Sequence, residues 1–196
     1  MNEQQQLLSK ILEDEYDDFA INVYCDWLEE NGFEQEANRI RNKGWRYSGL
    51  THLVGKTVHS ISRTDDQLLF LTDSDPVLAV VEGDCCSDSW FYSITGVENL
   101  IGQKVYFIID EDDNRKLDVD IDDGLGRQES DSAYGIGVVT EKGICTIIHR
   151  NSSNGYYGGE LRSYIDKLSK LQPDWKGEPV LKDWVTPPVV REKKVD

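Results

Sequence analysis

The stretch QLLFLTDSDPVLAVVE, residues 67–82, decides the fold of this chain. It holds two short apolar runs, Leu68–Thr72 and Val77–Val81, which are separated by the polar segment Asp73–Pro76. Runs of this length bounded by Asp, Ser and Pro are typical of β-strands that are joined by a tight turn. The stretch therefore predicts two strands that pair in an antiparallel sheet.

The same pattern recurs on both sides of this stretch, with turns at Asp65-Asp66 and Glu141–Gly143. Short apolar runs between such turns predict a larger antiparallel sheet. Residues 160–171 instead carry apolar side chains at helical spacing, which predicts a C-terminal helix over Leu161, Tyr164, Ile165 and Leu168. The further predicted strands are Thr57–Ile61, Phe91–Ile94, Val105–Ile109, Ile136–Thr140 and Ile144–His149.

The first 45 residues have a helical period, with apolar side chains three and four residues apart. Asp17 or Asp18 is suited to cap a second helix, Asn31-Gly32 to end it, and Gly44 to close a third. Helices this short must pack as one compact unit, and we predict that Trp27 lies in its core. The apolar positions are Leu7, Leu8, Ile11 and Leu12, then Ala20, Val23, Tyr24, Trp27 and Leu28, then Phe33, Ala37 and Ile40.

These patterns predict an α+β fold. A helical module occupies residues 1–48, an antiparallel β-rich domain with one C-terminal helix occupies residues 53–171, and an extended tail follows over residues 172–196. In the tail, Asp-Trp-x-x-x-Pro-Val occurs twice, around Trp175 and Trp184. Such an arm either packs on its own domain or recognises a partner.

The charge excludes several classes of function. The chain has 37 acidic and 21 basic side chains, and its formal net charge is −16. Binding to nucleic acid requires clustered Lys and Arg, so this balance excludes nucleic-acid binding through a general basic face. It also argues against docking on anionic membranes.

The cysteines and the N-terminus predict a cytoplasmic protein. MNEQQQLLSK has no basic leader followed by an apolar run, and no window reaches the length of a membrane helix. Cys25, Cys85, Cys86 and Cys145 form no CxxC pair, which is typical of reduced thiols. No nucleophile elbow or HExxH motif is present, so we expect neither an enzyme nor a cofactor.

The most acidic stretch, residues 110–131, holds ten acidic and three basic side chains. Asp118, Asp120 and Asp122 have the spacing of a calcium loop, but Asp123 stands where an EF-hand needs Gly. A solvated acidic loop or a looser divalent-ion site therefore remain the alternatives. The acidic residues that we expect to bind a partner are Asp110, Glu111, Asp112, Asp113, Asp118, Asp120, Asp122 and Asp123.

Two further motifs stand out. Asp84-Cys85-Cys86 brings two thiols and a carboxylate together, so one alternative is a metal or redox site, although adjacent side chains rarely reach one zinc ion. If the segment lies on a strand, one thiol faces inward and one outward, and no cationic neighbour in the segment would make either reactive. The Gly-rich segment 151–159 carries Tyr156 and Tyr157, which either plug the sheet or join the partner-binding surface.

The N-terminal region carries Tyr24-x-Asp26-Trp27-Leu28-Glu29-Glu30-x-Gly32 and then Ala37-x-x-Ile40-Arg41. In these residues it resembles the short helical repeat-companion domain. That family carries a Tyr-x-Asp-Trp-Leu-Glu-Glu-x-Gly run followed by an Ala-x-x-Ile-Arg helix, and the resemblance covers residues 5–43. It implies an accessory interaction module without catalytic residues. The matching residues are Tyr24, Asp26, Trp27, Leu28, Glu29, Glu30, Gly32, Ala37, Ile40 and Arg41.

Residues 53–168 resemble an uncharacterised domain found largely in bacteriophages and bacteria. Its marks are an Asp-Cys-Cys-Glu run, a Leu-Ile-Gly turn and a Ser-Asn-Gly-Tyr-Tyr run. This chain has Asp84-Cys85-Cys86, then Leu100-Ile101-Gly102, then Ser153–Tyr157, but Ser87 replaces the Glu. The resemblance implies a phage context and a β-rich fold.

We therefore expect a non-enzymatic acidic interaction protein, encoded by a phage, that binds and inhibits a basic surface of a host protein. A nucleic-acid-binding surface of a defence nuclease suits a dense array of carboxylates, because the array mimics the charge of DNA. We expect no direct binding to nucleic acid or membranes. The alternative is a metal-binding or small-ligand-binding module that uses the acidic loop or the Tyr-Gly loop.

Overall fold

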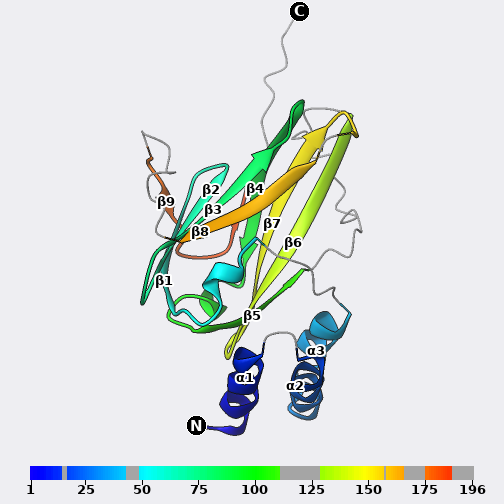
Figure 1. Ribbon diagram of the computed structural model, residues 1–196, viewed down its shortest axis with the longest axis vertical. Coiled ribbons are helices and arrows are strands. Elements are labelled where there is room, and N and C mark those ends of the chain that lie inside the picture. Colours follow the sequence, from blue (N-terminus) through cyan, green and yellow to red (C-terminus); the bar gives the residue numbers. More distant parts are fainter. Residues whose placement is uncertain (15–16, 43–48, 111–128, 157, 166–174, 187–196) are drawn as a thin grey trace, which may run out of the picture.

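The structure is a computed structural model in which two β-sheets face each other and three helices lie at one end (Figure 1). The residues that it describes are 1–14, 17–42, 49–110, 129–156, 158–165 and 175–186 of the 196-residue chain.

Over the described residues each sheet has five strands, and the strands pair in an antiparallel sense. The α+β class with antiparallel strands is therefore confirmed, and all seven predicted strands are present. The first sheet holds, in spatial order, β8 (Gly159–Ile165), β3 (Val77–Gly83), β2 (Gln67–Thr72), β1 (Val58–Arg63) and β9 (Glu178–Pro179). The second holds β10 (Trp184–Val185), β4 (Ser87–Thr95), β7 (Gly143–Ser153), β6 (Ser130–Thr140) and β5 (Val105–Asp110).

The main hydrophobic core lies between the two sheets. Phe70 of β2 is fully buried there together with Phe91 of β4 and Ile147 of β7. Short 3-10 turns, η1 (Thr51–Leu53) and η2 (Val97–Asn99), add Leu53 and Val97 to the same core. Because these side chains come from strands of both sheets, the β-rich part of the chain is a sandwich.

The predicted helix over residues 160–171 is wrong where the structure describes it. Residues 159–165 form β8, which pairs with β3 from Gly83↔Gly159 to Val77↔Ile165. The backbone of β3 needs a hydrogen-bonding partner on this side, and a strand provides one where a helix does not. Residues 166–171 of the predicted helix lie outside the described residues.

Three helices precede the sandwich: α1 (Glu3–Glu13), α2 (Asp18–Glu30) and α3 (Glu34–Arg41). Their ends follow local rules. Asp17 caps α2 by accepting hydrogen bonds from the amides of Phe19 and Ala20, and Gly32 after α2 has a φ of +85°. None of the described helices is long and apolar enough to cross a membrane. Gly44, the predicted end of the third helix, lies outside the described residues.

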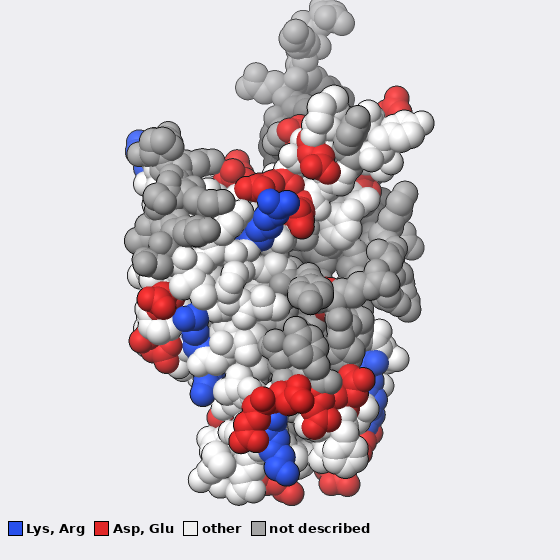
Figure 2. Space-filling model, in the orientation of Figure 1, with Lys and Arg blue, Asp and Glu red and all other residues white. Residues whose placement is uncertain are grey.

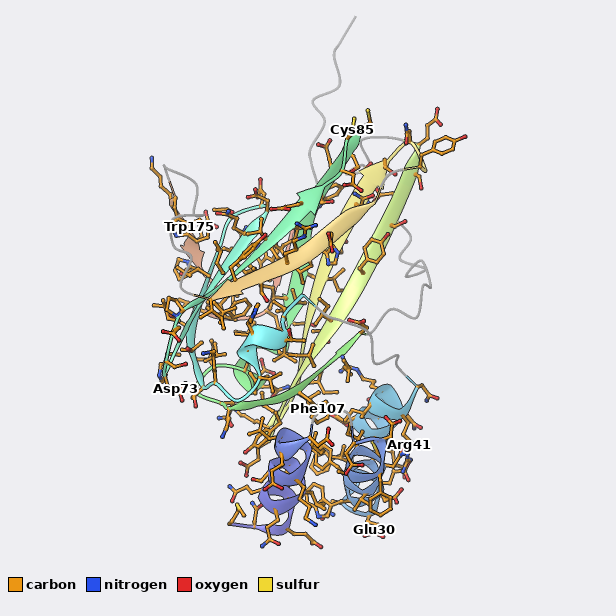
Figure 3. The ribbon with its side chains drawn as sticks, viewed as in Figure 1. Glu30, Arg41, Asp73, Cys85, Phe107 and Trp175 are labelled. Atoms are coloured by element: carbon orange, nitrogen blue, oxygen red, sulfur yellow. The ribbon has the colours of Figure 1, made fainter. Side chains whose placement is uncertain are left out.

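The helices do not have a core of their own. They share a second hydrophobic cluster with one end of the second sheet, in which Phe107 of β5 meets Tyr24 of α2 edge-on at 6.3 Å between ring centroids (Figure 3). Burial raises the pKa of Tyr24 to about 12. The other cluster members are Leu8, Ile11, Ala20, Ile21, Cys25, Leu28, Ala37, Ile40, Tyr106, Ile109, Val139 and Ile144.

This shared cluster corrects the prediction for Trp27. Its ring is only partly buried, stacks on Tyr24 at 6.1 Å, and donates a hydrogen bond from Nε1 to Glu3 at 3.3 Å. The cluster also buries side chains of β5, which lies some 80 residues away in the sequence. The helical period of residues 18–30 could not reveal that contact.

Polar contacts hold the helices against the turn between β6 and β7. Gln4 donates to the backbone oxygen of Glu141 at 2.8 Å, and Gln5 donates to its carboxylate at 3.0 Å. On the other side, Arg39 of α3 donates to the hydroxyl of Thr146 in β7 at 2.6 Å. The helical module and the sandwich are thus joined by an apolar cluster with hydrogen bonds at its margins.

The described part of the tail, residues 175–186, joins the edges of both sheets. β9 pairs with β1, Val180 is buried in the main core, and β10 pairs with β4. The guanidinium of Arg63 in β1 lies 3.9 Å from the centre of the ring of Trp184 in β10. The tail therefore packs on its own chain over these residues.

Candidate functional site

The helices carry a dense set of carboxylates. Among the described residues 1–42 there are ten Asp and Glu against three Lys and Arg, a net of −7. Figure 2 shows Asp and Glu side chains gathered in a band across this end of the molecule. We call the exposed members the acidic helical surface: Glu3, Glu13, Asp14, Asp18, Asp26, Glu30 and Glu34.

Two of the three cations are already engaged by the protein itself. Arg41 forms ion pairs with Asp26 and Glu29, and the hydrogen bond that it donates to Glu29 raises the pKa of its guanidinium. Arg39 is held by Thr146 at the junction with the sandwich. The surface therefore keeps a surplus of negative charge that a partner can meet.

An exposed aromatic ring lies within this surface. Phe19, in the first turn of α2, is 76% exposed. It borders a hollow of about 130 Å³ whose other lining residues are Leu7, Lys10, Asp17, Ala20 and Val23. A large apolar side chain surrounded by polar groups is the usual composition of an interaction surface. Sequence reasoning did not single out Phe19, although its place beside two acidic residues is a signal that could have done so.

Most of the predicted partner-binding acidic residues cannot be placed. Glu111, Asp112, Asp113, Asp118, Asp120, Asp122 and Asp123 lie outside the described residues. Asp110 ends β5 opposite Ile136 of β6. The acidic segment therefore connects two neighbouring strands of the second sheet.

At the other end of that segment, Asp131 forms an ion pair with Arg150. Its carboxylate accepts two hydrogen bonds from Arg150, at 2.5 Å from Nη2 and 3.3 Å from Nε. The guanidinium is 2% exposed and lies about 5 Å from the rings of Trp90 and Tyr92. A nearly buried ion pair of this kind fixes the start of β6 against β7.

The two loop motifs of the sequence meet at the end of the sandwich opposite the helices. The amide of Asp84 donates to the backbone oxygen of Gly158 at 3.1 Å, and the hydroxyl of Ser87 donates to the same oxygen at 2.9 Å. Beside this contact Tyr156 is 90% exposed, so it does not plug the sheet. Tyr157 lies outside the described residues.

The structure corrects the prediction for the cysteine pair. Cys85 and Cys86 lie in the turn between β3 and β4, and both are exposed. The amide of Ser87 closes this turn on the oxygen of Asp84 at 3.0 Å, and Cys86 takes a φ of +60°. A turn of this form does not alternate its side chains as a strand does, so neither thiol faces the core.

Sequence reasoning missed a buried polar run at the end of β7. The predicted strand ended at His149, whereas β7 continues to Ser153, and residues 149–153 are all buried. Inside this run Asn151 donates to the hydroxyl of Ser89 at 2.9 Å. The signal was present, because polar residues also begin β4 and β6, the two strands that pair with β7.

His149 is the one described residue with a buried side-chain nitrogen, Nδ1, that has no hydrogen-bond partner. Its ring stacks on Tyr134 at 5.1 Å, and burial lowers its pKa to about 4. The imidazole is therefore neutral at physiological pH. Among the described residues, no group of three or more His, Cys, Asp or Glu side chains is placed to hold a metal ion.

The comparisons with known proteins add one finding. Residues 51–162 match the model of a family described as a domain of unknown function, DUF7448. The chain belongs to the DUF7448 family. The DUF7448 region spans the sandwich from η1 into β8 and includes both loop motifs, whereas α1–α3 and the tail lie outside it. No curated protein and no solved structure matches the chain.

Proposed function

We propose that this protein is a non-enzymatic interaction protein that binds a basic surface of a partner protein. The observation that carries the proposal is the acidic helical surface, where carboxylates outnumber cations, together with the exposed ring of Phe19, which follows Asp18 in α2. Carboxylates of one sign accelerate association with a basic partner, and the effect weakens as salt screens it.

Phe19 provides the apolar contact that exposed carboxylates cannot provide. Exposed carboxylates mainly raise the rate of association, while a buried aromatic side chain provides much of the lasting affinity of an interface. The ring stands at the start of α2, close to Asp18 and beside the hollow lined by Leu7 and Val23. We therefore place Phe19 at the apolar centre of the interface and the carboxylates at its rim.

The finer parts of the proposal rest on the resemblances and on total charge. The repeat-companion resemblance of residues 5–43 supports an accessory interaction role for the helices. The phage context that the second resemblance implies supports a cytoplasmic host protein as the partner. The net charge of −16 supports a nucleic-acid-binding surface on that partner, such as that of a defence nuclease. In this proposal residues 110–131 and Tyr156, which the sequence predicts to bind the partner, contribute further contacts and inhibit it.

The test is charge reversal at matched sites. One variant carries Glu13→Lys, Asp18→Lys and Glu30→Lys on the helices, and its control carries three reversals of exposed acidic residues on the sandwich, Asp65→Lys, Asp75→Lys and Glu98→Lys. Both change the net charge by the same amount, so a difference between them reports position and not total charge.

Each protein is used to capture basic proteins from a host lysate at low and high salt, and association rates are then measured with the purified partner. We expect the helical reversals to slow association strongly at low salt and the sandwich reversals to slow it little. Phe19→Ala should raise the dissociation rate while leaving the salt dependence intact. Equal effects of the two reversal sets, or binding that does not change with salt, would refute the proposal.

A further inference from the structure

The turn between β3 and β4 presents two thiols side by side. The Sγ atoms of Cys85 and Cys86 are 3.5 Å apart, within hydrogen-bonding distance for sulfur, and both side chains are exposed at the tip of the sandwich (Figure 3). The chain's other cysteines, Cys25 and Cys145, are buried and fully inaccessible. Cys85 and Cys86 are therefore the two thiols of this protein that a reagent in solution can reach.

The backbone holds this arrangement. Cys86 is the one described non-glycine residue with a positive φ, a conformation that Gly or Asn usually adopts. The turn is fixed by the bonds of Asp84 and Ser87 to Gly158 and to each other. On its other side Gly83 packs so tightly that a Cβ there would lie 2.6 Å from the oxygen of Ser87. These contacts favour the unusual φ of Cys86 over a relaxed turn.

We propose that Cys85 and Cys86 form a reversible vicinal disulfide when the protein meets a small oxidising disulfide such as glutathione disulfide. The thiolate of one cysteine attacks glutathione disulfide, forms a mixed disulfide and releases one glutathione. The second thiolate then attacks the protein sulfur of that mixed disulfide, forms the Sγ–Sγ bond and expels the second glutathione. Two electrons pass to glutathione disulfide, and the two thiol protons end on the two glutathiones.

The spacing of adjacent Cα atoms also affects how easily the Cys85–Cys86 disulfide is reduced. Adjacent Cα atoms are about 3.8 Å apart across a trans peptide, which is closer than the roughly 4.4–6.8 Å of ordinary disulfides. A bond formed at this spacing is strained and is readily reduced again. The pair is thus suited to a reversible modification and not to a permanent cross-link.

The environment slows the first exchange reaction of the pair at neutral pH. The hydrogen bond and charge of Cys86, followed by a small effect of burial and the charge of Asp84, raise the pKa of the Cys85 thiol. Few thiolates are therefore present at neutral pH. Because the turn is bonded to Gly158, oxidation acts on the same end of the sandwich that exposes Tyr156.

The test treats the full-length protein with glutathione disulfide under native conditions and measures its intact mass. We expect the native protein to lose two hydrogen atoms and to carry no glutathione, and a dithiol reductant should restore its mass. Cys85→Ser and Cys86→Ser each keep one exposed thiol, so each should instead gain one glutathione. These single variants are matched controls, because each removes one exposed sulfur atom and keeps the other.

Peptide mapping after alkylation then locates the bond. We expect the oxidised native protein to contain one peptide in which both Cys85 and Cys86 resist alkylation until reductant is added. A stable glutathione adduct on the native protein, two free thiols after treatment, or a cross-link between two chains would overturn the proposal. Loss of mass in the Cys85→Ser, Cys86→Ser double variant would also overturn it, because the oxidation would then lie elsewhere.

Discussion

Replacing Phe107 with Ala tests whether the helices and the sandwich fold as one unit. The ring of Phe107 is 1% exposed, and it meets Tyr24 of α2 edge-on across the junction. Removing a fully buried Phe costs about 3–5 kcal/mol, and loss of the aromatic contact favours the upper part of that range. For a chain of this size, 4–5 kcal/mol lowers the Tm by about 8–20 °C.

The assay is urea and thermal unfolding followed by circular dichroism, with Phe19→Ala as the matched control. Phe19 is 76% exposed, so its removal should change the free energy of unfolding by less than about 0.5 kcal/mol. Trp27→Ala, which removes a partly buried ring, should fall between the two at about 2 kcal/mol. If Phe107→Ala destabilises the protein no more than Phe19→Ala does, the shared cluster does not join the two parts, and the reasoning is wrong.

Three further perturbations address the buried polar end and the tail. Asp131→Asn leaves Arg150 buried without its counter-charge and should cost about 3–5 kcal/mol in urea unfolding, whereas Glu160→Gln, in an exposed pair, should cost less than about 1 kcal/mol. Because His149 has a pKa of about 4 when folded and about 6.5 when unfolded, the free energy of unfolding should fall by on the order of 3 kcal/mol as pH drops from 6.5 to 4. His149→Phe should remove that part of the pH dependence, and an identical slope in the variant would contradict it. Removing residues 178–196 uncovers the core beneath Val180, so the Tm should fall and an apolar dye should bind more strongly; unchanged dye binding would show that the tail does not close the sandwich.

The sequence alone determined the elements whose signals are local. The hairpin of residues 67–82 was predicted from its two apolar runs and the turn between them, and it is present as β2 and β3. The second helix begins after its Asp17 cap and ends before Gly32, as its capping residues predict. These features depend on hydrogen bonds and dihedral angles within a few residues, which the sequence shows directly.

Only the tertiary structure decided the features that depend on distant partners. Residues 159–165 became a strand because β3, some 80 residues earlier, offered an open edge. Trp27 lies at the margin of the second hydrophobic cluster, because that cluster also contains buried side chains of β5. The helices alone would have predicted a cluster centred on Trp27. Cys85 and Cys86 came together in a turn that is held by Gly158. Helical spacing and strand alternation describe one element at a time, whereas burial, pairing and loop contacts depend on which elements meet, and that is set by the free energy of the whole fold.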